Sequence, residues 1–229
     1  MPEISATSCI GGPSITRTGF PTRLHHASGA WTRPGREPST AAHIVDLAHY
    51  VVGPIDAITG SAKTFITERP SVDDPSRMEP VTVDDCFAFL ARFQNGVTGT
   101  FEKARGWQPA GQLNYNDWEI NGTRGSLAFN LERLNELQVF FSDDPVEHRG
   151  WRVINVTDGQ HPYVGAWWPS GHIIGWEESH IHQIADFLMA IENDQPCTPG
   201  FAVGVQNQAV LDALVESAGS GRWVDVAQE

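Results

Sequence analysis

His43 is the first residue of this chain that could do chemistry. It opens a predicted helix that begins at residue 42 and is stopped by Gly53-Pro54. A neutral imidazole near pH 7 can accept or relay a proton from a hydroxyl group, although a histidine at a helix start more often only caps or packs. Asp46 and His49 follow at i+3 and i+6. Because His49 is turned well away from His43 on a helix, a metal site made of the three is disfavoured, and we interpret Asp46 and His49 as structural.

Two cations lie at the end of a predicted strand. Lys103 and Arg105 alternate to the same side of that strand, and Trp107 and Asn114 lie in the connection that follows. Side chains of these types could donate hydrogen bonds to the hydroxyl groups of a sugar or to an acid group. Solvated charges at a sheet edge explain the two cations equally well, so the pattern leaves both interpretations open.

A third group is aromatic and rich in imidazole, and consists of Trp168, His172, Trp176, His180 and His182. Aromatic faces pack against the C–H surfaces of pyranose rings, so a carbohydrate site is chemically sensible here. His172 and Trp176 are the better candidates because they lie in a predicted loop. His182 lies on a predicted helix with an apolar face, so a structural role is favoured for it.

The composition excludes several classes of function. A net charge of −13 with only 15 Lys and Arg argues against nucleic acid, which requires a basic surface, and against an anionic membrane surface. No apolar run approaches the roughly 20 residues that span a bilayer, and no signal peptide is recognisable, so we predict a cytoplasmic protein. Cys9, Cys86 and Cys197 form no CxxC pair and are interpreted as free thiols, and no GxSxG nucleophile turn occurs.

After the helix that begins at residue 42, periodicity and turn signals predict strands followed by two more helices. The predicted elements are a strand at 55–66, hairpins at 86–105 and 117–130, strands at 137–142 and 151–157, polar loops at 70–85 and 158–177, helices at 178–193 and 199–221, and a strand at 223–226. This order predicts an α+β fold with an open, mostly antiparallel β-sheet and helices on one face. We expect the uncovered sheet face to be apolar and to drive assembly into a homo-oligomer.

Residues 1–41 differ in kind from the rest of the chain. They are rich in Gly, Pro, Ser, Thr and Arg and show neither the period of a strand nor that of a helix. We therefore expect residues 1–41 to be irregular or disordered, and residues 42–229 to form one domain.

Several motifs resemble, in order, those of the Gfo/Idh/MocA family, the glucose–fructose oxidoreductase and inositol dehydrogenase group. They are AHIVDLAHYVVGPI from residue 42, VTGTFEKARG from residue 97, WEINGTRGSLAFN from residue 118, and the helix–loop–helix from residue 175 that ends in WVDV. Each motif alone is weak, but together they cover residues 42–226. The resemblance implies the family's C-terminal substrate-binding and oligomerisation domain.

The resemblance also implies a chemistry. Family members hold NAD or NADP in an N-terminal Rossmann domain and oxidise a sugar or cyclitol hydroxyl by hydride transfer, assisted by the lysine of a Glu-Lys-Pro motif and by an Asp-x-x-x-His pair. His43 matches the histidine of that pair, whereas the aspartate falls on Ser39. Lys103 lacks the following proline and is not assigned the role of the family's lysine. The chain has no GxGxxG after a strand, so we expect no cofactor to be bound by this chain alone.

We hypothesise that residues 1–42 are a frame-shifted or mis-started reading of a gene that encodes the Rossmann domain further upstream. Codons compatible with residues 29–42 permit, in another frame, a string with an aspartate shortly before His43. Two alternatives stay open: a non-catalytic domain that binds a carbohydrate or assembles, and a gene fragment without independent function.

Overall fold

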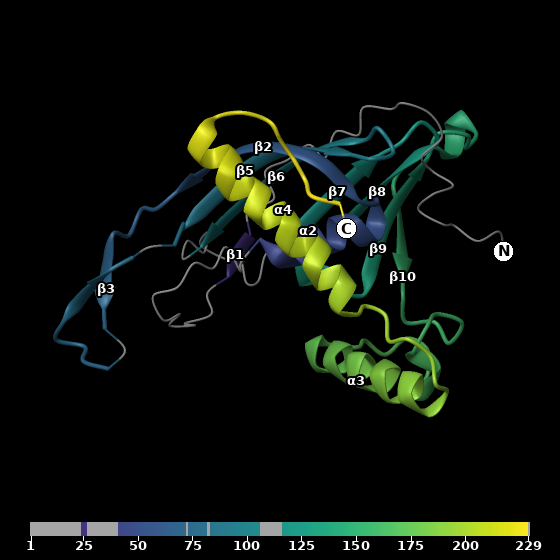
Figure 1. The fold of residues 1–229 in the computed structure, drawn as a ribbon. Helices are drawn as coiled ribbons and strands as arrows, with labels where there is room; N and C mark the ends of the chain where they lie inside the picture. The colour runs from purple at the N-terminus through teal and green to yellow at the C-terminus, as the bar shows by residue number, and fades with distance from the viewer. Residues whose placement is uncertain (1–23, 27–40, 72, 82, 106–115, 229) are drawn as a thin grey trace.

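The computed structural model describes residues 24–26, 41–71, 73–81, 83–105 and 116–228 (Figure 1). Within these residues the main sheet has five strands in the order β1-β6-β5-β2-β11. These are β1 (Leu24–His26), β6 (Thr98–Arg105), β5 (Cys86–Phe93), β2 (Ile55–Lys63) and β11 (Val224–Asp225). All neighbours are antiparallel except β1, which pairs parallel with β6. The short strand β1 lies inside the segment for which the sequence predicts coil.

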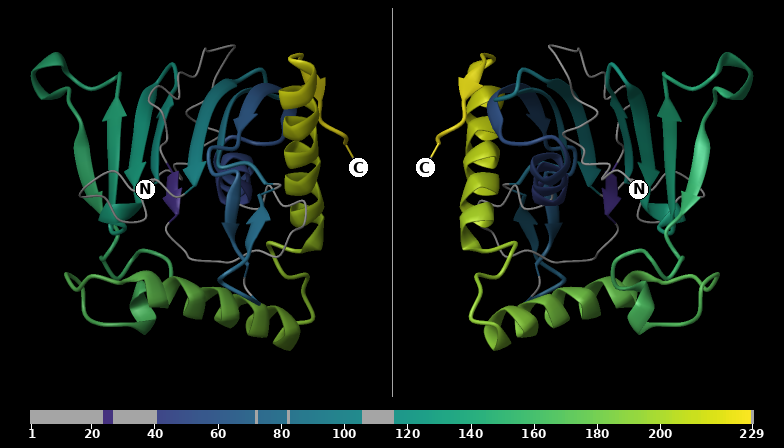
Figure 2. Two further views of the ribbon diagram at one scale, coloured as in Figure 1. Left: turned by 90° about the vertical axis from the view of Figure 1, so that its left-hand side faces the viewer. Right: turned by 90° about the vertical axis from the view of Figure 1, so that its right-hand side faces the viewer.

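Two helices cover one face of this sheet, α2 (Ala42–Val51) and α4 (Phe201–Ser220) (Figures 1 and 2). Side chains alternate along β5, so that Phe87, Phe89 and Phe93 are buried while Leu90 and Arg92 are exposed. The buried side chains join those of α2 and α4 in one core cluster. The predicted α+β fold, with an open sheet and helices on one face, is therefore confirmed.

The uncovered face of the main sheet is more polar than the sequence suggested. Its outward side chains, exposed or partly exposed, include Thr59, Ser61, Lys63, Ala88, Leu90, Arg92, Thr98, Thr100 and Glu102. Leu90 is 46% exposed, and Arg92 lies 4.5 Å from the ring of Trp223, which is 44% exposed. The face thus combines small, hydroxyl and charged side chains with a leucine near its centre.

A second sheet continues the fold. In the described part of the chain it has four antiparallel strands in the order β10-β9-β8-β7. They are β10 (Arg152–Asn155), β9 (Glu136–Phe141), β8 (Gly125–Asn130) and β7 (Asp117–Asn121). Trp118 of β7 meets Phe101 of β6 edge to face at 5.9 Å, so the two sheets share the core.

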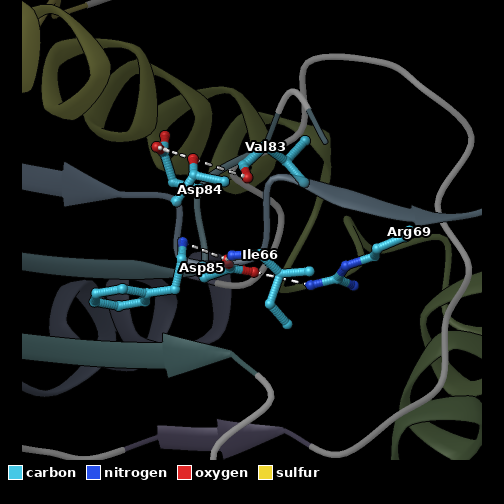
Figure 3. A network of polar contacts seen from close by, with 7 residues as sticks. Ile66, Arg69, Val83, Asp84 and Asp85 are labelled. Atoms are coloured by element: carbon cyan, nitrogen blue, oxygen red, sulfur yellow. Dashed lines mark hydrogen bonds and ion pairs between the residues drawn. The ribbon is translucent and has the colours of Figure 1, made fainter. Parts of the chain in front are cut away.

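An arm projects from the main sheet between β2 and β5, where the sequence predicts a polar loop (Figure 1). It contains β3 (Glu68–Pro70) paired with β4 (Met78–Pro80). Asp85 holds its root: the buried carboxylate accepts hydrogen bonds from the backbone N–H groups of Phe65 and Ile66, both at 2.8 Å, and from Arg69 at 2.9 Å (Figure 3). Thr64 also donates to Asp84 at 3.2 Å. Cys86, the residue after Asp85, pairs with Ala104 of β6, which lies between Lys103 and Arg105. The hydrogen bonds of Asp85 therefore hold the end of the sheet where these two cations lie.

The remaining helix, α3 (Trp176–Glu192), lies apart from the core, below α4 in Figure 1. The sequence predicts this helix within two residues at its start. None of its side chains is buried. No helix within the described residues is both long and apolar enough to cross a membrane.

Candidate functional site

His43 lies in the first turn of α2 with its side chain exposed to solvent. The opposite side of the helix fixes its position, because Ile44, Val45 and Ala48 are each 0% exposed in the core. The N-cap residue is Ala41, which has no side chain that can cap the helix. The imidazole is therefore held on a rigid element and is free to meet a ligand.

Tyr50 extends the exposed stripe that His43 begins. Seven residues bring an α-helix back to nearly the same face, about 10 Å further along its axis. Tyr50 is 87% exposed. The exposed stripe of α2 thus carries an imidazole at one end and a phenol at the other.

Asp46 and His49 lie on the side of α2 that meets α4. Asn207 of α4 donates a hydrogen bond to Asp46 at 2.9 Å. Among the described residues, neither ring nitrogen of His49 has a hydrogen-bond partner of normal geometry. Burial lowers the pKa of His49, while Asn207 and the carboxylate of Asp46 oppose that shift. This contact between the two helices fits the structural role expected for Asp46 and His49.

Lys103 is a buried cation, 2% exposed, on the helix-covered face of β6. Phe87 is its partner across the strand pair. Lysine is rarely buried to this extent. Lys103 is therefore not a solvated charge at the sheet edge, which was one of the two interpretations of the sequence. Arg105 is the last residue of β6, and the structure describes only its backbone. Trp107 and Asn114 lie outside the described residues.

The loop before α3 is organised by aromatic rings and imidazole. Trp167 donates to His182 Nε2 at 2.6 Å, so that nitrogen is the acceptor. Tyr163 stacks on the same ring at 4.3 Å and donates to Asp186 at 2.7 Å, a bond that raises the pKa of Tyr163. Tyr163 has a φ of 67°, which is uncommon for a residue other than glycine.

The two residues that the sequence placed in a loop lie at the edge of this cluster. That prediction was wrong for Trp176, which is the first residue of α3, whereas His172 does lie in the loop. Trp176 meets His180 edge to face at 5.8 Å and is 49% exposed. His172 is exposed, and its Nδ1 lies 2.8 Å from the carbonyl oxygen of Pro169. Trp168 is 65% exposed. The apolar rings Trp168 and Trp176 are therefore available to a ligand or to another protein surface.

Sequence reasoning missed Tyr50, Tyr163, Trp167 and Asp186. Tyr50 was detectable, because it stands at i+7 from His43 on a predicted helix. The other three join the site through the conformation of an irregular loop, which carries no periodic signal. His182, for which a structural role was favoured, is the residue that binds this loop to α3.

Neither α3 nor α4 begins in a setting that is typical of a dinucleotide site. A pyrophosphate binds the N-terminus of a helix that follows a strand and a glycine-rich turn. The start of α3 instead carries Glu177 and Glu178, and Glu178 accepts from the Gly175 N–H at 2.7 Å. The start of α4 follows the loop after α3 and not a strand. Within the same residues, no group of three or more His, Cys, Asp or Glu side chains is placed to hold a metal ion.

Cys86 is not an activated nucleophile. Burial, followed by the charges of Glu102 and Asp85, raises the pKa of its thiol. A raised pKa keeps the thiol protonated near pH 7, where only the thiolate is reactive. Cys86 therefore has a packing role at the start of β5.

Solved structures similar to this one are oxidoreductases. An oxidoreductase domain protein from Kribbella flavida superposes with a TM-score of 0.82 at 33% identity, over 99% of this chain and 62% of that chain. A levoglucosan dehydrogenase in complex with NADH and levoglucosan superposes with a TM-score of 0.76 at 40% identity, over 83% of this chain and 50% of that one.

Sequence comparison agrees with the structural comparison. A levoglucosan dehydrogenase from Pseudarthrobacter phenanthrenivorans is 39% identical over 200 residues, which are 82% of this chain and 50% of the relative. The chain thus spans about half the length of this curated relative. Residues 38–128 match the model of the GFO/IDH/MocA C-terminal domain. We conclude that this chain belongs to the Gfo/Idh/MocA family and carries its C-terminal domain.

Proposed function

We propose that this chain is the substrate-binding and oligomerisation half of an NAD(P)-dependent dehydrogenase that acts on a sugar, a sugar derivative or a cyclitol. One observation carries the proposal: the family's C-terminal domain presents an exposed imidazole, His43, at the start of a helix that is packed into the core. The relative at 40% identity is described in complex with NADH and levoglucosan, an anhydrosugar, which favours a carbohydrate as the substrate class.

His43 is the proton-handling residue in this proposal. Oxidation of a hydroxyl carbon releases a hydride, which the nicotinamide accepts in the other half of the enzyme, and the hydroxyl proton. An imidazole within hydrogen-bond reach of the hydroxyl oxygen takes that proton as a general base. The exposed position of His43 leaves a ring nitrogen free for this contact.

The remaining candidates would bind the substrate. Trp176 at the start of α3 offers an exposed ring, and His172 in the loop before it offers an exposed imidazole. Lys103 would act from the end of β6 as a buried donor, joined by Arg105, Trp107 and Asn114 from the same strand end and the connection that follows. A desolvated cation is a strong hydrogen-bond donor to hydroxyl oxygens.

A chimera tests the proposed dehydrogenase activity and the role of His43 in it. The N-terminal half of the levoglucosan dehydrogenase replaces residues 1–41, so that its own residues lead directly into α2. We expect NAD-dependent oxidation of levoglucosan or a related sugar. His43→Ala should lower turnover by roughly 10²-fold or more, the scale of a lost general base.

The matched control is His49→Ala on the same helix, which should cost far less because His49 faces α4. Equal losses in the two variants, or turnover within about threefold of the parent for His43→Ala, would remove His43 from the mechanism. A chimera that binds NADH and the sugar but never turns over would favour the non-catalytic alternative.

The open face of the main sheet is the proposed surface of self-association. Neither α2 nor α4 covers it, and Leu90 lies near its centre. Leu90→Glu places a charge at that point and should lower the molar mass measured by light scattering at micromolar concentration. Val146→Glu, at a 77% exposed position in a distant loop, is the control and should leave the mass unchanged. A parent chain that is already monomeric would contradict the proposal.

A further inference from the structure

Helix α3 is folded with its apolar side turned outward. The side chains that are partly covered by the rest of the chain include Glu178, His182 and Asp186. The large apolar residues on the opposite side are all exposed by about half or more: Ile181 49%, Ile184 60%, Phe187 51%, Leu188 58% and Ile191 63%. They recur at i, i+3, i+4 and i+7, so they form one stripe along the helix.

The polar side of α3 is held by specific contacts. His182 accepts from Trp167, and Asp186 accepts from Tyr163. Tyr163 also stacks on His182 at 4.3 Å. These contacts fix the rotation of the helix about its axis, so the apolar stripe cannot turn inward without breaking them. A stable protein does not leave such a stripe in water, because a contiguous apolar patch of this kind marks an interface.

Two further exposed apolar side chains follow α3 in the chain. Phe201, the first residue of α4, is 99% exposed, and Val205 one turn later is 44% exposed. Glu177 and Glu192 belong to the same helix as the stripe, and α3 carries no Lys or Arg. The complementary surface is therefore apolar with basic side chains at its rim.

We infer that the apolar stripe of α3 is where the N-terminal half of the enzyme docks. The inference rests on the proposed function. The relative is matched over 200 residues that make up 50% of its length, so roughly as many residues remain. Since the match is to a C-terminal domain, those residues precede it in the chain.

Other occupants fit less well. A second copy of the chain has the open sheet face available, on the side of the sheet away from α2 and α4. Residues 1–41 lack the helical or strand periodicity that would present a continuous apolar surface. A nucleotide-binding half of about 200 residues is large enough to cover a 17-residue helix along its whole length.

Cysteine labelling tests the inference. Ile184→Cys reports on the stripe, and Val146→Cys, 77% exposed in the loop between β9 and β10, is the control. Each is placed in the full chain and in a fusion with the N-terminal half of the levoglucosan dehydrogenase joined ahead of Met1. Maleimide labelling is quantified at each site by peptide mass spectrometry.

We expect labelling at residue 184 to be at least tenfold slower in the fusion than in the full chain, and labelling at residue 146 to be the same in both. Equal rates at residue 184 would overturn the inference. So would slow labelling in the full chain alone: a second copy covers the stripe if the rate depends on concentration, and residues 1–41 cover it if it does not.

This result is independent of catalysis. Protection at residue 184 combined with an inactive catalytic chimera would support docking and reject the proposed activity. An active chimera with residue 184 unprotected would retain the activity and reject this docking surface.

Discussion

Helices α2 and α3 have the same kind of sequence and opposite surroundings. Both carry an apolar stripe at helical spacing, and the sequence predicts both. In α2 the stripe is buried, with Ile44, Val45 and Ala48 at 0% exposure, whereas in α3 Phe187 remains 51% exposed. Periodicity therefore predicts that a helix forms and which side of it requires cover. It does not predict whether the cover comes from the same chain.

The difference divides the molecule into a part that buries its own apolar side chains and a part, α3, whose apolar side chains need a partner to cover them. The main sheet, α2, α4 and β7 share one core cluster. Helix α3 contributes nothing to that cluster and is attached through polar and aromatic contacts of its inner side. We expect the first part to determine the stability of this chain and the second to respond to a partner.

Matched truncations of two phenylalanines should give the largest contrast. Phe89 is 4% exposed and stacks on Phe101 at 4.7 Å, so Phe89→Ala should lower the free energy of unfolding by about 3–5 kcal/mol. Phe187→Ala in α3 should stay within about 0.5 kcal/mol, as for an exposed position. Urea unfolding followed by circular dichroism measures both.

The fusion with the relative's N-terminal half sharpens the same comparison. Once that half covers α3, Phe187→Ala should become destabilising, while the cost of Phe89→Ala should not change. Similar losses of stability for the two substitutions in the unfused chain would show that α3 is already covered. That result would contradict the view that α3 depends on a partner.

The arm between β2 and β5 should show an intermediate effect. Like α3 it has exposed apolar side chains, Phe65 at 62% and Met78 at 52%, but a buried carboxylate holds its root. Asp85→Ala leaves two backbone N–H groups without their acceptor, which should cost about 2 kcal/mol. The partner Arg69 is too exposed to add much.

Asp84→Ala is the control for the arm, because it loses only a hydrogen bond from Thr64 at 3.2 Å. It should stay within about 0.5 kcal/mol of the parent in urea unfolding. If Asp84→Ala costs as much as Asp85→Ala, the root of the arm is not held by the buried carboxylate.

Much of the fold followed from local signals. The hairpin β5–β6 turns at Asn95-Gly96, a dipeptide that favours tight turns, and the alternation along β5 separates the buried from the open side. The strands β3 and β4 were missed because Pro70 and Pro80 end these three-residue segments. Such short strands have no measurable period, so pairing alone defines them.

Less of the candidate site could be predicted. His43 was identifiable through its family motif, and its exposure is compatible with the proposed role. The burial of Lys103 was missed, although alternation along β6 places Lys103 on the same side as the apolar Phe101. The contact of Trp167 with His182 depends on a loop fold that includes a positive φ at Tyr163, which no local propensity requires.

The smallest expected effect is a pH dependence at the contact of α2 with α4. Burial lowers the pKa of His49 from its ordinary value near 6.5, so the folded state favours the neutral imidazole. Below about pH 6.5 the unfolded chain therefore binds more protons than the folded one. The contribution of His49 to stability is complete above that pH and is lost as the pH falls toward the lowered pKa. Urea unfolding at pH 7.5 and 5.5 measures this loss.

Because other groups also titrate in this range, the comparison must be made between variants. His49→Gln should lose less stability between pH 7.5 and 5.5 than the parent does, whereas His148→Gln, at an exposed position in the loop between β9 and β10, should lose as much as the parent. An identical pH dependence in all three proteins would mean that His49 is solvated in the native state. In that event α2 would be less firmly packed against α4 than its buried face indicates, and the contrast with α3 would narrow.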